Sequence, residues 1–370
     1  MQPLLLHEEE WEYVRTLLPP DLDESARKMN ALVRCRNVPD AAALIRLALA
    51  YAVSDLSLKD VAAWASTLEV AQITGPGLFY RLREAENWLA HVLGRVLAEQ
   101  LPQTVGGWPV RIVDATVING PGNKYVRRGA ADAVQWRAHV QIDPVTGKFS
   151  AVELTDNSGG ERLDRHQFQA GEIVLGDRAY ATARGIHAVR QSDAHVIARF
   201  SPGNLRTCDL QGQRIFLAEK ENEVPTVGVL EYKIKIPVPP KPTKSRKVWN
   251  SAKAIAWIPA RAIAARTRPI EGHEGQVIWI LTTTESSQVP AIAALGLYRL
   301  RWQIELLFKR LKSLLHIDTL PSREGPTAKS WMLARLIAAG IAQRLVQPSG
   351  PLSPWGYELR FHPPAQSSNP

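Results

Sequence analysis

Three acidic side chains lie at positions from which they can act together. Asp114 follows the apolar run 110–113, Asp177 follows the apolar run 173–176, and Glu305 lies in a run of strong helix formers. Both apolar runs have the length and composition of buried strands, so both aspartates are predicted at strand ends, where sites form in open sheets. Carboxylates gathered in this way can hold two divalent cations roughly 4 Å apart.

This donor set favours the chemistry of phosphodiester bonds. One cation activates a water or a 3′-hydroxyl, and the other stabilises the leaving oxygen. Ligands that are all oxygen select Mg²⁺ or Mn²⁺ rather than zinc. The sequence has no Cys or His cluster with zinc spacing and no glycine-rich phosphate loop before a helix.

Other interpretations of single acids stay open. An acid at a strand end is often a turn or helix-cap residue, and Glu305 could pair with Arg301 or Lys309 on its own helix. Four rival ligands lie in turns or at a helix start, where a structural role is favoured. The rivals are Asp143, Asp156, Glu161 and Asp164.

A row of polar side chains accompanies Glu305. Tyr298, Arg301, Glu305 and Lys312 are separated by three, four and seven residues, and residues 298–315 contain no Pro or Gly. On one continuous helix these spacings place the four side chains within an arc of about 60°, along the edge of an apolar stripe. A carboxylate beside a phenol and two cations suits a metal ion held next to a polyanion.

The chain before this row divides by pattern. Residues 1–105 read as helical, with helices predicted over 11–18, 23–34, 40–52, 57–64 and 78–99. Ser57 to Asp60 has the pattern of a capping box. The last two helices resemble a helix-turn-helix that carries Arg81 and Arg83 early in its second helix, which favours DNA contact, with plain helical packing as the alternative.

Strands dominate from residue 106 onward. Strands are predicted over 110–114, 135–142, 148–154, 172–177 and 195–200, and helices over 161–169 and 182–191. This order predicts a mixed sheet with helices on its faces. Residues 201–275 are predicted to be a β-rich insertion, with strands at 215–217, 227–236 and 253–257 and a basic, proline-rich loop over 237–246. A core strand over 277–282 and helices over 289–296 and 331–346 complete the second core segment, 276–346, and 347–370 reads as a disordered tail.

The charge balance indicates a polyanionic partner. Lys and Arg total 45 against 36 acids, a surplus of 9, and the pI is about 9.6. Nucleic acid is the commonest partner of such a chain, although a merely basic enzyme is the alternative. No apolar run is long enough for a membrane span, no signal peptide is evident, and two cysteines form no disulfide framework, so a cytoplasmic location is expected.

At this point the chain resembles a known family. The row from Tyr298 to Lys312 matches the Y-x2-R-x3-E-x6-K signature of the DDE insertion-sequence transposases, which have a ribonuclease-H-like catalytic core. Residues 113–116 resemble that family's first acidic motif, and residues 175–180 resemble its second. The resemblance covers roughly residues 105–320. In this family a β-rich insertion precedes the glutamate, and here 305 − 177 = 128 residues leave room for it.

The resemblance implies a fold and a role for each site residue. The fold would be α/β: a ribonuclease-H-like mixed sheet with a β-rich insertion and an N-terminal helical DNA-binding domain. Asp114, Asp177 and Glu305 would coordinate two Mg²⁺ or Mn²⁺ ions. Phosphates around the scissile bond would be held by Tyr298, Arg301 and Lys312. Trp279 would stack on a flipped base during hairpin formation, with a core strand position as the equal alternative, and Arg178 would touch the DNA backbone.

The resemblance also implies a function. Such a protein binds the inverted-repeat ends of its mobile element as a homodimer on double-stranded DNA. It cleaves the strands with metal ions and joins the exposed 3′-hydroxyl to target DNA, in the bacterial cytoplasm and at the nucleoid. Two alternatives remain: a catalytically silent DNA-binding copy that acts as a repressor, and a ribonuclease-H-like nuclease that acts on RNA or branched DNA.

Overall fold

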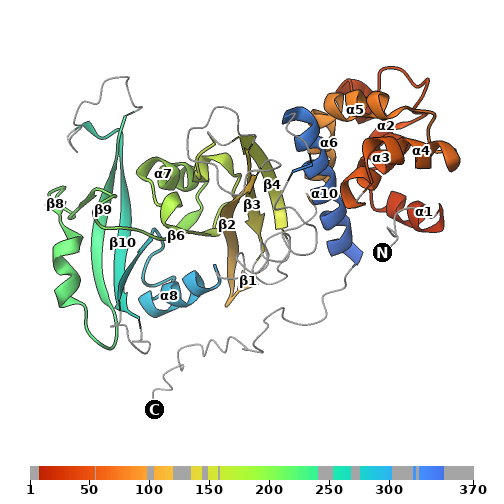
Figure 1. Ribbon diagram of the computed structural model, residues 1–370. Coiled ribbons are helices and arrows are strands. Elements are labelled where there is room, and N and C mark those ends of the chain that lie inside the picture. The colour runs from red at the N-terminus through yellow and green to blue at the C-terminus, as the bar shows by residue number, and fades with distance from the viewer. Residues whose placement is uncertain are drawn as a thin grey trace, which may run out of the picture.

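Two regions make up the described part of the chain (Figure 1). The computed structural model describes residues 8–54, 56–97, 104–119, 135–143, 149–156, 159–240, 253–267, 276–301, 320–321 and 325–345. One region gathers the N-terminal helices and the last helix, and the other holds a large sheet. Within the described residues, no helix has the length and apolar character that crossing a membrane requires.

The N-terminal helices begin where the sequence provides caps. They are α1 (Glu8–Thr16), α2 (Leu22–Lys28), α3 (Ala41–Val53), α4 (Leu58–Thr67), α5 (Gly75–Glu84) and α6 (Glu86–Leu97). The Asp40 side chain accepts a hydrogen bond from the Ala43 amide at the start of α3. The capping box predicted at Ser57 and Asp60 is confirmed, with both reciprocal bonds present.

Two predicted helices differ from the structure. The helix predicted over 78–99 is two helices, α5 and α6, which meet at Ala85. Side chains of the last helix engage this junction: Ser330 Oγ donates to the Leu82 carbonyl at 2.6 Å, and Lys329 pairs with Glu86. The helix predicted over 23–34 ends at Lys28, because the chain turns into the left-handed region at Asn30 (φ 60°).

The strands form one mixed sheet of eleven. They are β1 (Thr104–Val105), β2 (Trp108–Asn119), β3 (Gln135–Ile142), β4 (Phe149–Asp156), β5 (Ile173–Gly176), β6 (His195–Arg199), β7 (Thr207–Cys208), β8 (Arg214–Ile215), β9 (Leu230–Val238), β10 (Ala256–Arg266) and β11 (Val277–Thr282). Their order is β4-β3-β2-β5-β6-β11-β10-β9-β7-β8, with β1 paired to β2. The strands β2, β5 and β6 are parallel, and the rest pair antiparallel. The first five strands of the order form the ribonuclease-H-like arrangement that the resemblance implies, so the predicted fold class is confirmed.

Alternation along the strands gives the sheet two buried faces. On one face Ile112, Leu175, Ile197 and Ile280 pack in one core with α8 (Ala291–Arg299), which contributes Leu297. On the other face the neighbouring residues of the same strands pack with α7 (Ala183–Gln191). Figure 1 shows α7 and α8 on either side of β6.

Several predicted strand boundaries are wrong. β2 does not end at Asp114 but continues to Asn119, because β3 pairs with it along that whole stretch. The strand predicted over 253–257 is β10, which begins at Ala256 and runs to Arg266. It accommodates Pro259 because β11 pairs with β10 only from Arg261 onward, so Pro259 has no β11 partner.

Two further differences involve short elements. Residues 161–169 contain only the 3₁₀ turn η2 (Leu163–Arg165), and a second 3₁₀ turn, η3 (Arg178–Tyr180), follows β5. The strand predicted at 215–217 stops at Ile215, and the 3₁₀ helix η4 (Leu217–Glu223) follows it. The insertion strands β7 to β10 extend the core sheet beyond β11 instead of forming a separate sheet.

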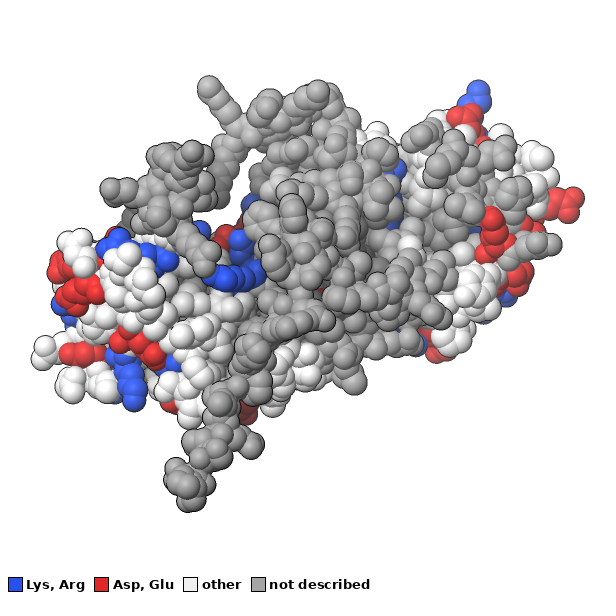
Figure 2. Space-filling view, turned by 90° about the horizontal axis from the view of Figure 1, so that it is seen from below, with Lys and Arg blue, Asp and Glu red and all other residues white. Residues whose placement is uncertain are grey.

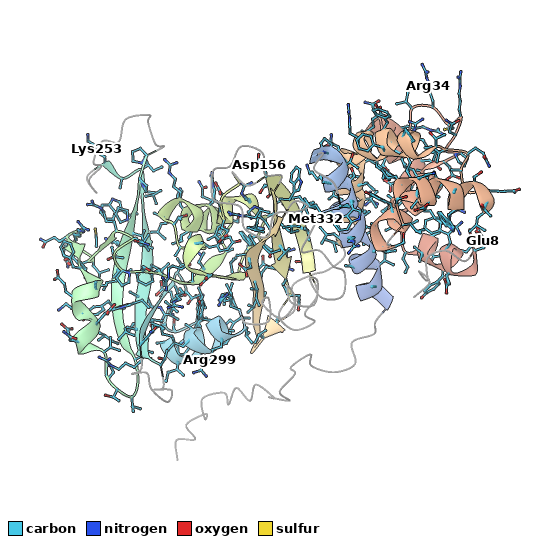
Figure 3. All side chains as sticks on the ribbon, in the orientation of Figure 1. Glu8, Arg34, Asp156, Lys253, Arg299 and Met332 are labelled. Carbon is cyan, nitrogen blue, oxygen red and sulfur yellow. The ribbon has the colours of Figure 1, made fainter. Side chains whose placement is uncertain are left out.

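The last helix, α10 (Gly325–Leu345), packs against the N-terminal helices α3, α5 and α6. Its Met332 is fully buried and lies where α10 meets them (Figure 3). Gly340 permits the close approach, since a Cβ there would lie 3.0 Å from Val96. The domain division that we predict therefore places in one segment, 276–346, a helix whose packing partners lie in another, 1–105.

Candidate active site

Parallel pairing of β2 and β5 places the two aspartates side by side in the sheet. Ile112 is the register partner of Leu175, and each aspartate lies two residues further along the chain: Asp114 within β2 and Asp177 directly after β5. The side chains of Asp114 and Asp177 therefore point to the same face as Ile112 and Leu175, the face that α8 covers. The structure thus brings together the two aspartates that the sequence singled out.

The chain turns sharply after β5. Asp177 has an extended backbone, and its carbonyl accepts a hydrogen bond from the Tyr180 amide at 3.0 Å. Gly176 fits this turn, because a Cβ at that position would lie 3.0 Å from the Cβ of Tyr180. Tyr180 itself is fully buried, and its hydroxyl has no hydrogen-bond partner within the described part of the chain.

Asp114 has an unusual electrostatic environment. Burial raises the pKa of its carboxyl to about 6, and the nearby carboxylates of Glu161 and Asp177 act in the same direction. The Ala115 amide, which donates to Asp114 Oδ1 at 2.8 Å, and the Arg301 guanidinium oppose this rise. Carboxylates that disfavour one another's charge in a half-buried place are stabilised by a cation between them.

Tyr298, in the last turn of α8, reaches this pair. Its hydroxyl donates to Asp177 Oδ1 at 3.2 Å, and the Arg301 guanidinium lies 5.7 Å from the centre of its ring. Burial raises the pKa of the Tyr298 hydroxyl, as does Asp177, whereas Arg301 and Arg199 oppose the rise. Two members of the predicted polar row are therefore at the site, although Tyr298 contacts an aspartate here.

The helix predicted over 298–315 is wrong at its start. Tyr298 belongs to α8, which ends at Arg299 with Leu300 as its C-cap. The single helical wheel that relates Tyr298 to the residues after it is therefore broken at its first turn. Glu305 and Lys312 lie outside the described residues.

The two weaker predictions fall in different surroundings. Trp279 lies on β11, is only 2% exposed and packs edge-on against Phe200 at 6.2 Å. This placement favours the core alternative over base stacking. Arg178 is exposed in the turn directly after Asp177, where a DNA backbone can reach it.

Sequence reasoning missed one cation and set aside one acid. Arg199 ends β6 next to Asp177, and only the strand register reveals it. Glu161, set aside as a structural residue, is close enough to Asp114 and Tyr180 to raise the pKa of each. Its carboxylate lies 3.8 Å from Arg137 on β3, a pairing that the sequence does not indicate.

The donor set fits a divalent cation. Asp114 and Asp177 offer only oxygen, which suits Mg²⁺ or Mn²⁺. Within the described residues, no three or more His, Cys, Asp or Glu side chains are grouped so that they could hold a metal ion. The third predicted ligand, Glu305, is outside those residues.

The N-terminal helices carry a second candidate site, for DNA. α4 and α5 are two packed helices joined by a short turn, and Gly75 permits their close approach, because a Cβ there would lie 3.2 Å from the Cα of Lys59. Tyr80 on α5 is 56% exposed, and the guanidinium of Arg83 lies 5.8 Å from its ring. The expectation that Arg83 comes early in its helix is wrong, since it lies in the last turn of α5.

Charge is mixed on the surface near the sheet. Figure 2 shows basic side chains interspersed with acidic ones over the end of the molecule that carries the insertion strands. Individual cations at the two candidate sites therefore indicate a surface for a polyanion better than the total charge does.

Comparison with known proteins shows the family of the chain. Residues 106–341 match the family described as "Transposase DDE domain". The chain is 34% identical to the InsL transposase for insertion sequence element IS186A of Escherichia coli (strain K12) over 356 residues, which are 90% of this chain and 92% of that protein. It is also 34% identical to the transposase for insertion sequence element IS421 of Escherichia coli, again over 90% of this chain and 92% of that protein.

Among solved structures, a piggyBac transposase synaptic complex with hairpin DNA is similar at a TM-score of 0.45 and 8% identity, over 94% of this chain and 76% of that one. The family match covers more than half of the 370 residues, and the relatives match over nearly their whole length. The chain therefore belongs to the DDE transposase family.

Proposed function

We propose that this protein is a transposase whose DNA-cleaving site is built from Asp114, Asp177 and Glu305. Membership of the DDE family makes it a transposase, an enzyme that cleaves DNA and transfers strands. The observation that supports this site is the register of β2 and β5, which brings Asp114 and Asp177 to one level two residues beyond the paired Ile112 and Leu175, with Tyr298 bonded to Asp177. Glu305 follows Arg301 by four residues, so it can approach the same place.

The three carboxylates would hold two Mg²⁺ or Mn²⁺ ions. Bound cations of this kind activate the attacking oxygen and neutralise charge on the leaving oxygen of a phosphodiester. Asp114 and Asp177 bring negative charge to a half-buried place, where the raised pKa of Asp114 reflects the cost of holding that charge without a cation. The protein's own contribution is thus a fixed set of oxygen donors on rigid strands.

The polar row would bind the substrate strand. Arg301 presents a planar fork that can hold a phosphate through two hydrogen bonds, and Lys312 adds a point charge. Tyr298 orients the Asp177 carboxylate through its hydroxyl. Arg178, exposed beside Asp177, would touch the neighbouring DNA backbone.

Recognition of the element ends would fall to α5. Its exposed face offers Tyr80 and Arg83, and the exposed Arg34 lies on the adjoining loop, directed away from the helices (Figure 3). A helix of a helix-turn-helix unit that presents such side chains fits the major groove. Arg83→Ala should weaken binding to the element end. The control is Arg95→Ala on α6, which removes a cation that pairs with Asp21 at 3.1 Å and should leave binding unchanged.

Cut-and-paste transposition requires two ends to be held together. We therefore expect a homodimer on inverted-repeat DNA. Light scattering of the protein with a duplex of its own element end would measure the mass of the complex. A complex with one protein chain on one duplex, under conditions in which cleavage proceeds, would contradict this expectation.

A cleavage assay tests the proposed function. The substrate is a labelled duplex that spans the junction of the element end and its flanking DNA, with Mg²⁺ present. Wild-type protein should nick at the junction and join the end to a target plasmid. Asp114→Asn, Asp177→Asn and Glu305→Gln should each abolish cleavage and leave binding of the duplex intact. Cleavage that survives in all three variants would sink the assignment.

The same assay separates the alternatives. A silent DNA-binding copy would bind the duplex and leave it uncut with either Mg²⁺ or Mn²⁺. A ribonuclease-H-like nuclease would cut an RNA–DNA hybrid or branched DNA faster than the duplex end.

A further inference from the structure

Arg199 is the last residue of β6, the strand next to β5. In the parallel register Gly176 is the partner of Ala198, so the residues that follow them, Asp177 and Arg199, stand at the same level. On its other side Arg199 is the register partner of Ile280 on β11. The cation is therefore fixed by backbone pairing on both edges of its strand.

Its side chain points to the same face as the aspartates. Ile197, two residues earlier, and Ile280, directly opposite, both belong to the core on the α8 face, whereas Ala198 belongs to the other core. Because side chains alternate along a strand, Arg199 shares the face of Asp177 and of α8. The influence of Arg199 on the pKa of Tyr298 agrees with this placement.

Arg199 is half-buried, and within the described residues no hydrogen bond or ion pair engages its side chain. Other arginines in the sheet are bonded: Arg111 pairs with Glu172 at 2.8 Å, and Arg261 pairs with Glu231 at 3.0 Å. A partly desolvated cation without an anion is unfavourable, so its position is suited to a ligand that supplies the negative charge.

We propose that Arg199 is a phosphate ligand of the DNA-cleaving site, which binds the backbone of the substrate strand together with Arg301. This inference rests on the proposed function and adds to it a residue outside the polar row. A guanidinium fork matches two oxygens of one phosphate, which a lysine ammonium does not. Asp177 and Arg199 then act on neighbouring atoms of the strand, one through a cation and the other directly.

The experiment compares Arg199→Gln and Arg199→Lys with the wild-type protein. A matched control is Arg214→Gln, since Arg214 is exposed on the edge strand β8, where it stacks 4.4 Å from the ring centre of Phe216. Binding of the element-end duplex is measured with Ca²⁺ over a range of salt. Arg199→Gln should lower the slope of log affinity against log salt by about 1, the loss of one phosphate contact, and Arg214→Gln should leave the slope unchanged.

A methylphosphonate scan identifies the phosphate. Each duplex carries one uncharged phosphate near the cleavage position. One such substitution should weaken binding of wild-type protein by about tenfold and should have no further effect on Arg199→Gln, because the contact is already lost. Arg199→Lys should keep the salt slope but slow single-turnover cleavage by about tenfold, because it lacks the fork.

The outcomes separate this inference from the proposed function. The role of Arg199 would be overturned if the effect of Arg199→Gln on binding added to that of every methylphosphonate and left the salt slope unchanged. This holds even if the aspartate variants lose cleavage. Conversely, a coupled phosphate combined with cleavage that survives in the aspartate variants would retain Arg199 as a DNA ligand and overturn the cleavage site. If Arg199→Gln fails to fold, as judged by thermal unfolding, the salt slope and the coupling are measured with Arg199→Met, which also removes the charge.

Discussion

At the scale of single residues, Asp114 is held in a place that disfavours its charge. Its pKa lies at about 6, above the ordinary value of 3.8, because the carboxyl is buried and has Glu161 and Asp177 near it. Between these two pKa values, the Asp114 carboxyl binds more protons in the folded protein than in the unfolded chain. The contribution of Asp114 to the stability of the metal-free protein therefore falls as pH rises from about 4 to about 6.

Asp114→Asn should remove this cost. The proteins are compared in EDTA. At pH 3 to 4, where Asp114 is protonated, the Tm difference between variant and wild type should reflect only the exchange of one neutral side chain for another. By pH 8 the Tm of the variant should have risen by about 2 °C or more relative to wild type. Calorimetry across this range measures the difference. Asp60→Asn is the control with the opposite sign, because hydrogen bonds from Ser57 lower the pKa of Asp60. That variant should lose stability relative to wild type as pH rises. A flat difference for Asp114→Asn would contradict the burial of its charge.

Tyr298 gives a second prediction at this scale. Its hydroxyl is bonded to Asp177, so Tyr298→Phe should leave that carboxylate less well oriented and slow single-turnover cleavage by about tenfold. Affinity for the DNA end should stay within about twofold. Tyr13→Phe, which alters an exposed phenol on α1, is the control. Equal cleavage rates for Tyr298→Phe and wild type would refute this role.

At the scale of elements, α10 brings the C-terminal part of the described chain against the N-terminal helices. It packs on α3, α5 and α6, and Arg335 donates to the carbonyl of Ala52 at the end of α3. Gly340 lies against α6, where a Cβ would approach Val96 within 3.0 Å and Leu97 within 3.2 Å. Close contact between these helices thus depends on the absence of a side chain.

Gly340→Leu should separate α10 from α6. We expect a loss of about 1–3 kcal/mol in the free energy of unfolding, as for other overpacked cores, measured by chemical denaturation. Gly94→Ala on α6 is the matched control, because nothing lies within 4 Å of a Cβ there, and it should stabilise the protein by about 0.5–1 kcal/mol. An unchanged stability of Gly340→Leu would show that the helices do not approach this closely.

The sequence predicts the type of many elements but not all of their boundaries. Apolar or mostly apolar runs that end in an acid predict Asp114 and Asp177, and the order of strands and helices predicts a mixed sheet with helices on its faces. The ribonuclease-H-like arrangement of that sheet is what the family resemblance implies. The boundaries depend on partners: β2 extends beyond Asp114 because β3 pairs with it, and the helix predicted over 78–99 divides where Ser330 engages the Leu82 carbonyl. Local propensity contains no information on such distant contacts.

Arg199 shows the same limit within the site. Nothing in residues 195–199 distinguishes this cation from others in the chain. Its proximity to Asp177 follows from the register of β5 and β6, and its face follows from the alternation of that register. A pairing between strands is a property of the whole sheet, so spacing along the sequence could not reveal it.

At the scale of the whole molecule, the N-terminal helices and the sheet share one core. Side chains from α3 and α6, from α10, and from β2 and β5 belong to a single buried cluster. The proposed DNA-reading helix α5 contacts α10, and α10 is the helix that follows the segment with Glu305. α10 therefore packs in the same buried core as the sheet and also contacts α5.

The central claim is that Asp114, Asp177 and Glu305 form one cation site. Its most direct test is Mn²⁺ binding by metal-stripped protein, measured by electron paramagnetic resonance. Asp114→Asn, Asp177→Asn and Glu305→Gln should each weaken binding by about tenfold or more. Asp164→Asn, which alters a rival acid bonded to Arg162 at 2.8 Å, should bind as wild type does. Wild-type affinity in Glu305→Gln would contradict the claim.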